Sequence, residues 1–361
     1  MLASVNAPAP SKTACPAWGE TPPLLAARGY PKDAAHLFGR LHRLATWEDD
    51  AASLSRGARA FVDAHLDLTL PTIVSREPSA DGSTRLAIAL ADGARVEAVH
   101  MPRALASKAP RTTVCLSSQV GCAMGCTFCR TAQMGLVRNL AAHEIVAQLY
   151  AVLLALGPRS AERLNLVFMG MGEPLHNVEA VVGALDVLCD PAGLGVAPSR
   201  VTVSTAGHVP GLARLAESRY RPELAISVNA VTDALRSELM PVNRRWPLEA
   251  LRTALDAWPR RPHEKITLEY VLLAGKNDGE RDAELLAAWI GNLRHVVNVI
   301  PFNAWGDATS PYAAPSEAAL QRFASRLSAA GCLVKVRRSR GRDVRGACGT
   351  LVTSSQRLVR R

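Results

Sequence analysis

The sequence predicts an α/β protein built on a partly closed (βα)6 barrel, with a small N-terminal module of helices and a β-hairpin. From about residue 112, short apolar segments of strand length alternate with amphipathic segments of helix length. This alternation is typical of a parallel sheet whose strands are joined by helices. An open, doubly wound sheet is the second choice. In either fold we expect the functional site at the carboxyl ends of the strands.

The sequence pattern divides the chain into four parts. Residues 1–20 are rich in Ala, Pro and Ser, which is typical of a disordered tail. Residues 21–105 form the predicted accessory module, in which helical spacing of apolar residues gives way to a hairpin pattern between residues 84 and 101. The core is expected over 106–350, followed by a basic C-terminal tail at 351–361.

The core contains segments that alternate between the two kinds of periodicity. Strands are expected at 112–117, 164–170, 200–205, 223–229, 265–273, 295–302 and 332–339. Helices are expected at 143–156, 178–189, 247–258, 283–293 and 316–330.

Composition and charge limit the kind of protein. Hydrophobic residues make up 48% of the 361 residues, as in ordinary globular proteins, and no apolar run approaches the roughly 18–20 residues of a membrane span. The first residues lack the pattern of a signal peptide, and eight cysteines are too sparse for a disulfide scaffold. We therefore expect a cytoplasmic protein. Its net charge of +10 favours an anionic partner, RNA or DNA first, although a merely basic soluble protein is the alternative.

Three cysteines with the spacing C-x3-C-x2-C are the strongest chemical signal in the chain. Cys122, Cys126 and Cys129 stand in the stretch GCAMGCTFCR. Three thiolates from one loop can hold a 4Fe–4S cluster and leave one iron open, where the amino and carboxylate groups of S-adenosylmethionine (SAM) can bind. The alternative is a structural zinc site, but such sites favour C-x2-C pairs and need a fourth protein ligand. We expect the cluster.

Polar and glycine residues follow several of the predicted strands. Taken singly, each is more often a cap or a turn residue, and a Gly-Pro turn after a strand is common. Their shared place at the carboxyl ends of the strands, facing the cysteine loop, instead predicts a binding site. In this interpretation Glu173 accepts from the SAM ammonium and glycines let the backbone approach a ligand. The residues are Gly172, Glu173, Ser204, Ser227, Asn229 and Asn303.

Two further features lie near the predicted site. Cys115 precedes the cysteine loop, and Cys348 lies between glycines near the C-terminus; by composition alone each would be a buried structural thiol. Basic residues gather between Lys335 and Arg345, directly before Cys348. Such a run is usually a solvated face, but its position predicts contact with RNA phosphates.

The motifs together resemble the RlmN/Cfr family of radical-SAM RNA methyltransferases over about residues 20–350. They are CLSSQVGCAMGCTFCRTAQMGLVRNL, VFMGMGEPLHN, VTVSTAG, LAISVNA, LMPVNRRWPLEAL, IPFN and ACG. The resemblance implies a barrel of the radical-SAM type, a 4Fe–4S cluster, SAM, and methylation of an adenine ring carbon in 23S ribosomal RNA. RlmN-type members act on C2, several of them also on tRNA, whereas Cfr-type members act on C8.

The resemblance also implies roles for individual residues. Cys122, Cys126 and Cys129 would hold the cluster, and Gly172, Glu173, Ser204, Ser227, Val228, Asn229 and Asn303 would line the SAM site. Cys348 matches the cysteine that becomes S-methylated, Cys115 its partner thiol, and Glu97 the acid/base carboxylate. Asn229 departs from the family, since many members carry histidine there. The link between Pro102 and Cys115 is also longer than usual.

An electron-poor adenine carbon is not nucleophilic, so ordinary methyl transfer from SAM to it fails. The resemblance implies a reaction that uses two SAM molecules instead. One methylates Cys348, the other generates a radical on that methyl group, and a disulfide between Cys115 and Cys348 forms as the product leaves. The implied partners are 23S rRNA, with tRNA left open, and a reducing, flavodoxin-like electron donor; we expect a monomer without membrane association. Two alternatives remain: a radical-SAM enzyme acting on a partner protein, and a non-catalytic iron–sulfur RNA-binding protein.

Overall fold

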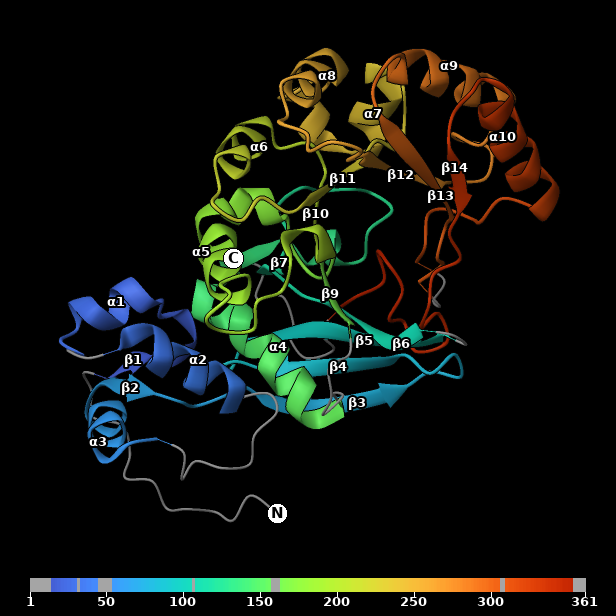
Figure 1. Ribbon diagram of the computed structural model, residues 1–361. Coiled ribbons are helices and arrows are strands. Elements are labelled where there is room, and N and C mark those ends of the chain that lie inside the picture. Colours follow the sequence, from blue (N-terminus) through green and yellow to red (C-terminus); the bar gives the residue numbers. More distant parts are fainter. Residues whose placement is uncertain are drawn as a thin grey trace.

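The computed structural model describes residues 14–30, 33–44, 54–105, 108–156, 163–305 and 309–352. The described residues form a mixed α/β structure, as the sequence predicts (Figure 1). No helix in these ranges is both long enough and apolar enough to cross a membrane.

A ten-stranded open sheet runs through the molecule in the order β14-β13-β12-β11-β10-β9-β6-β5-β4-β3. Its strands from β6 to β14 are parallel, and β3, β4 and β5 are antiparallel. The parallel strands are β6 (Lys108–Cys115), β9 (Arg163–Phe168), β10 (Val201–Thr205), β11 (Glu223–Ser227), β12 (Ile266–Leu272), β13 (His295–Pro301) and β14 (Val334–Val336). The antiparallel strands are β3 (Thr72–Pro78), β4 (Thr84–Ala89) and β5 (Arg95–Leu105).

Helices connect successive parallel strands and follow one another around the outside of the sheet (Figure 1). Their apolar stripes pack on the strands, so the main core lies between the helices and the sheet. They are α4 (Ala142–Leu156), α5 (Val178–Leu188), α6 (Val209–Ala216), α7 (Asp233–Leu239), α8 (Leu248–Asp256), α9 (Glu280–Ile290) and α10 (Glu317–Ala329).

The predicted β-hairpin continues the main sheet. Strand β5 pairs with β6 from Val99↔Cys115 to Leu105↔Lys108, so the hairpin covers an edge of β6 that would otherwise have unpaired backbone groups. Strand β3, which the sequence analysis did not anticipate, adds a further strand at the same edge. Its burial alternates between exposed and half-buried positions, and this edge position explains why its hydrophobic signal is weak.

Three short helices precede the sheet: α1 (Pro22–Ala27), α2 (Ala34–Leu44) and α3 (Arg56–His65). The predicted helical spacing in α2 is confirmed, because Leu37, Phe38 and Leu41 are all buried. In Figure 1, α1 and α2 lie toward α5 and α4, and α3 lies farther out beside β2 (Leu66–Asp67).

The predictions of an N-terminal tail at 1–20 and a C-terminal tail at 351–361 are wrong in part, because some of these residues pack against the core. Within the expected N-terminal tail, Cys15 pairs with Leu66 in a short parallel ladder, and Trp18 is 5% exposed because its ring packs edge-on against Tyr150. Within the expected C-terminal tail, Leu351 is 3% exposed and the Val352 amide is hydrogen-bonded. Buried aromatic and aliphatic contacts order these segments. Residues 1–13 and 353–361 lie outside the described residues.

Candidate active site

The carboxyl ends of the parallel strands and the loops after them line a pocket. Most of the residues predicted from the sequence meet there. From that set, the lining includes Cys122, Cys126, Cys129, Gly172, Glu173, Ser204, Ser227, Asn229, Asn303 and Cys348. Val228, Cys115 and Glu97 do not line it.

The cysteine loop joins two short strands, β7 (Gln119–Gly121) and β8 (Leu136–Asn139), that pair with each other. Its base is closed by a hydrogen bond from the Cys122 amide to the Gly135 carbonyl at 2.8 Å. Gly121 has φ +77°, and a Cβ there would lie 1.9 Å from the Gly135 oxygen, so only glycine fits at the base. This tight closure explains how one short loop directs three thiols into one pocket.

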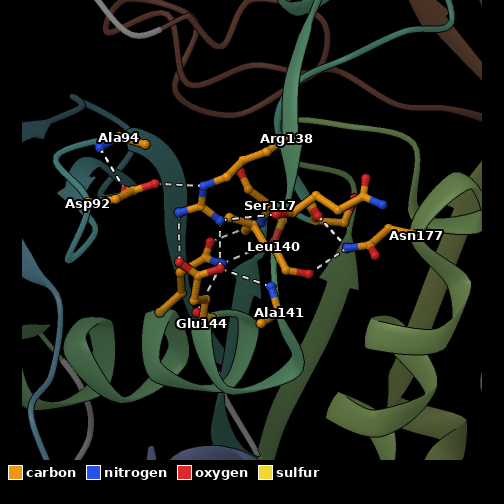
Figure 2. Close-up of polar contacts among 11 residues, drawn as sticks. Asp92, Ala94, Ser117, Arg138, Leu140, Ala141, Glu144 and Asn177 are labelled. Carbon is orange, nitrogen blue, oxygen red and sulfur yellow. Dashed lines mark hydrogen bonds and ion pairs between the residues drawn. The ribbon is translucent and has the colours of Figure 1, made fainter. Parts of the chain in front are cut away.

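A network of charged and amide side chains anchors the far end of the loop (Figure 2). Arg138 of β8 donates to Asp92 at 2.7 Å, in the turn between β4 and β5, and to both carboxylate oxygens of Glu144 at 2.8 Å. Glu144 also accepts from the Ala141 amide at the start of α4. The Asn177 side-chain amide donates to the Leu140 backbone carbonyl at 2.7 Å. The loop is therefore tied to the hairpin and to α4, and bidentate arginine pairs of this kind fix geometry well.

The donor set fits an iron–sulfur cluster. Burial raises the pKa of Cys122 to about 12 and raises the pKa values of Cys126 and Cys129 as well. Such thiols stay protonated at neutral pH unless a metal replaces the protons. Among the described residues, no three His, Cys, Asp or Glu side chains are placed to share a single metal ion. A 4Fe–4S cube differs in presenting a separate iron to each thiolate.

Glu173 lies at the junction of two strand ends. Its carboxylate, 3% exposed, accepts from the Leu175 amide at 3.0 Å and from the Ala206 amide at 2.8 Å, and burial raises its pKa. Gly170 and Gly172 line the pocket, and both are also needed where two loops pack together. A Cβ on Gly170 would lie 2.6 Å from the Leu116 carbonyl, and one on Gly172 would lie 2.6 Å from Gln119. These glycines let the loop after β9 approach the loop after β6.

Asn229 holds the end of β11 against β12. It has φ +57°, in the left-handed region that asparagine tolerates better than most residues. Its side-chain oxygen accepts from the Val271 amide at 2.8 Å, and its nitrogen contacts the Met240 sulfur at 3.2 Å. Val228 is fully buried, and its amide donates to the Glu269 carbonyl. Asn229 thus positions backbone at the pocket wall, a role that its sequence position did not reveal.

Cys348 lies in a loop that is held from two sides. The Asn303 side chain donates to the Cys348 carbonyl at 3.2 Å and to Ser339 at 2.9 Å. The Arg130 amide, next to Cys129, donates to the Gly349 carbonyl at 2.8 Å. These bonds place Cys348 beside the cysteine loop.

Cys115 and Cys348 line a second, smaller pocket together with Arg337. Both cysteines are free thiols in the structure. Cys115 ends β6 and is 6% exposed; burial raises its pKa to about 12, while the Arg337 guanidinium acts in the opposite direction. Arg337 and Cys348 line both pockets, so they lie at the boundary between them.

Sequence reasoning missed Glu269 and assigned Arg337 to RNA binding. Glu269 lies in β12 and lines the first pocket. Its Oε1 accepts a hydrogen bond from the Asn298 side-chain nitrogen at 3.0 Å and lies 3.7 Å from Nη1 of Arg337. Burial raises its pKa, and within the described part of the chain its Oε2 accepts no hydrogen bond. A lone carboxylate inside the apolar strand KITLEYVLL was the available signal. An unsatisfied buried oxygen facing the pocket fits a ligand with donors, such as the ammonium or hydroxyl groups of SAM.

Glu97 lies on β5, outside both pockets. It is 2% exposed, and it accepts from Arg85 and from the Val352 amide, both at 3.0 Å. Burial raises its pKa to about 7, although Arg85 opposes the shift. Val99, two residues along the same face of β5, lines the pocket of the two thiols.

The raised pKa of Glu97 predicts a pH-dependent stability. Its folded-state pKa of about 7 exceeds the usual 4.5, so the stabilisation present below pH 4.5 should be lost as pH rises through 7. In Glu97→Gln this loss should be absent. The difference in unfolding free energy between wild type and Glu97→Gln should therefore change by up to about 3 kcal/mol between pH 4 and 8. Denaturant unfolding at several pH values measures it. Glu77→Gln, on the more exposed second carboxylate of Arg85, is the control, and a pH-independent difference for Glu97→Gln would contradict the assignment.

The sequence also matches known proteins. Residues 116–287 match the family described as the radical SAM superfamily. A dual-specificity RNA methyltransferase RlmN from Syntrophobacter fumaroxidans is 42% identical over 318 residues, covering 88% of this chain and 89% of the relative. One of the same name from Dinoroseobacter shibae is 38% identical over 352 residues, covering 92% and 87%.

A solved structure agrees with these relatives. The crystal structure of a radical SAM methyltransferase from Sphaerobacter thermophilus has a TM-score of 0.81 and 38% identity, covering 94% of this chain and 98% of the other. Family members use a 4Fe–4S cluster and SAM, for which the cysteine loop and the polar pocket provide suitable groups. The chain belongs to the RlmN family and is a SAM-dependent radical-SAM RNA methyltransferase.

Proposed function

We propose that the protein methylates C2 of an adenine in 23S ribosomal RNA, and an adenosine of tRNA as a second substrate, through a methyl group carried on Cys348. The observation that supports this most directly is the position of Cys348. It lines one pocket with the three-cysteine loop and a second pocket with Cys115. The relatives are named dual-specificity RNA methyltransferases, which is consistent with two RNA substrates.

The pocket residues have distinct proposed roles. Cys122, Cys126 and Cys129 hold the cluster. SAM is positioned by the strand-end residues Gly172, Glu173, Ser204, Ser227 and Asn303, and Val228 and Asn229 contribute through the backbone. When bound, the cluster supplies the electron that splits SAM and yields a 5′-deoxyadenosyl radical. Buried walls keep water away from this chemistry.

Cys348 and Cys115 carry the proposed methyl transfer. The Cys348 thiolate takes the methyl group of one SAM molecule, so that a carbon–sulfur bond forms as that of SAM breaks. After a hydrogen atom is removed from this methyl group, its carbon bonds to the adenine. Glu97 accepts the proton lost from the adduct, and the adduct returns its unpaired electron to the bound cluster. The Cys115 thiolate then attacks the Cys348 sulfur, so the disulfide forms as the sulfur–carbon bond breaks, and the released carbon takes up a proton to complete the methyl group. Because Val352 now binds Glu97, this role requires the segment around Val352 to shift.

The position of the methyl group tests the proposal. Purified 23S rRNA and tRNA would be incubated with cluster-loaded enzyme and SAM, digested, and analysed by mass spectrometry against C2- and C8-methyladenosine standards. We expect 2-methyladenosine in both RNAs. The C8 isomer would instead assign a Cfr-type activity. No methylated adenosine, despite a full cluster and SAM cleavage, would favour the alternative of a radical-SAM enzyme acting on a protein.

The same proposal includes the type of fold, the domain organisation, the location and the electron donor of the protein. The sheet is interpreted as a partial (βα)6 barrel, with residues 21–105 as an accessory module and 106–350 as the core. The protein is proposed to work as a cytoplasmic monomer with a flavodoxin-like electron donor. The pocket supports the barrel interpretation, since residues from β9 to β13 and the loops after them line it together.

Phosphate binding is proposed for the exposed members of the basic segment. Arg337 lines the thiol pocket, and Arg340 donates to the Pro102 carbonyl at 2.7 Å. Because both already have contacts within the protein, phosphate binding is not assigned to them. Arg342 and Arg345 are exposed beside the Cys348 loop.

Replacing Arg342 and Arg345 together with glutamine should weaken RNA binding and reduce the slope of log affinity against log salt by roughly one unit per lost phosphate contact. Filter binding at several salt concentrations measures the slope. Arg281→Gln with Arg322→Gln, on the outer helices α9 and α10, is the matched control and should leave it unchanged. An unchanged slope in the folded Arg342/Arg345 variant would return the segment to the role of a solvated face.

A further inference from the structure

Arg236 of α7 is 0% exposed and heads the largest fully buried side chains of the described residues. Its Nε donates to the Val228 carbonyl at 3.1 Å, and its Nη1 donates to the Asn243 side-chain oxygen at 2.8 Å. Its Nη2 donates to the carbonyls of Ala206 at 2.7 Å and Ser227 at 3.1 Å. Every one of these acceptors is a neutral oxygen.

A buried guanidinium is normally paired with a carboxylate, because an isolated charge inside a protein is strongly destabilising. Among the described residues, no carboxylate forms an ion pair with Arg236; Asp233, which is exposed, lies behind Asn243 and binds that amide at 2.9 Å. Burial lowers the pKa of Arg236 to about 10, so the group remains charged at neutral pH. The fold therefore holds a positive charge that lacks a direct negative partner.

The charge lies behind the cysteine loop. Ala206 and Ser227, whose carbonyls it binds, both line the first pocket. The end of α7 is fixed to the loop, since the Leu239 carbonyl accepts from the amide of Thr127, the residue after Cys126. Arg236 lies within electrostatic range of the Cys126 sulfur. Gly207, with φ +106°, leaves the space that the guanidinium occupies, since a Cβ there would lie 3.3 Å from Nη2.

We propose that Arg236 is the internal counter-charge of the iron–sulfur cluster and raises the reduction potential of that cluster. The inference rests on the proposed ligand set of Cys122, Cys126 and Cys129. Accepting one electron from a one-electron donor makes the cluster one unit more negative. A fixed positive charge in a medium of low dielectric constant stabilises the reduced state more than the oxidised state. Arg236 contacts no substrate in this scheme, so it tunes and positions the cluster.

A purely structural role is the competing explanation, since Arg236 also ties β10 and β11 to the segment after α7. Three variants separate the two roles. Arg236→Gln and Arg236→Met remove the charge, and replacing a buried ion with an apolar side chain of similar size is often well tolerated. Arg236→Lys keeps the charge and loses most of the hydrogen bonds. A structural role affects all three variants, whereas the electrostatic role separates lysine from the neutral pair.

The test is a redox titration of the reconstituted protein without SAM or RNA, after iron and sulfide have been counted and folding checked by circular dichroism. Either neutral variant should be reduced at least tenfold less readily at a fixed potential, equal to a midpoint about 59 mV more negative for one electron. Arg236→Lys should lie closer to wild type than either of them. Neutral variants that fold without the cluster but fail to hold it, while lysine holds it, would also support the counter-charge.

Equal midpoints in wild-type and neutral variants with full clusters would overturn the proposal. So would equal shifts in the lysine and neutral variants, or loss of folding in all three cluster-free variants, which would make Arg236 a structural clamp. A wild-type protein that binds no cluster would instead contradict the proposed ligand set and function.

Discussion

Cys115→Ala should produce enzyme with RNA covalently attached to Cys348. In the proposed reaction, the bond between the Cys348 sulfur and the methylene carbon attached to the adenine breaks only when a second thiol attacks the Cys348 sulfur. Cys115 shares the second, smaller pocket with Cys348, where burial raises the pKa of Cys115 and the Arg337 guanidinium opposes that shift. A denaturing gel of a reaction with labelled RNA should show a protein–RNA band and little free methylated RNA.

Two controls define the outcome of that experiment. The double variant Cys115→Ala/Cys348→Ala should give no band, because the attachment point is absent. Cys189→Ala, which removes another buried cysteine at the end of α5, should release methylated RNA as the wild type does. Free methylated RNA at wild-type yield from Cys115→Ala would show that another group resolves the adduct.

Replacing any one of Cys122, Cys126 or Cys129 with alanine should abolish cluster binding and with it all SAM cleavage. The loop offers two buried thiols and one half-buried thiol, and a cluster with only two protein thiolates loses much of its binding free energy. After anaerobic reconstitution, the variants should lack the visible absorption of the cluster. Cys115→Ala and Cys348→Ala should retain it, because these thiols lie in the second pocket or at its boundary. Equal loss in those two variants would show that the ligand set is wrong.

Hydrophobic periodicity predicted the mixed α/β class, and the cysteine spacing identified residues that line the main pocket, because both signals are local in the chain. The strands β9 to β13 lie close to the expected segments, since a buried parallel strand is a continuous apolar run bounded by turn residues. The three cysteines lie within eight residues of one another, so a single tight loop brings them together. The strand-end residues followed from the rule that parallel strands present their carboxyl ends at one edge.

The tertiary structure alone decided which groups act on one another across the sheet. Arg337 reads as one member of a basic run in the sequence, yet β14 pairs with β13 and places it beside Glu269 and the two thiols. Asn303 reads as a turn residue, yet it holds the loop of Cys348, 45 residues away. Arg236 reads as a surface arginine of a short helix, and only the fold buries its charge behind Cys126. Local sequence thus determined the elements and the cysteine loop, whereas the partners of the charged groups depended on long-range packing, which periodicity and spacing do not encode.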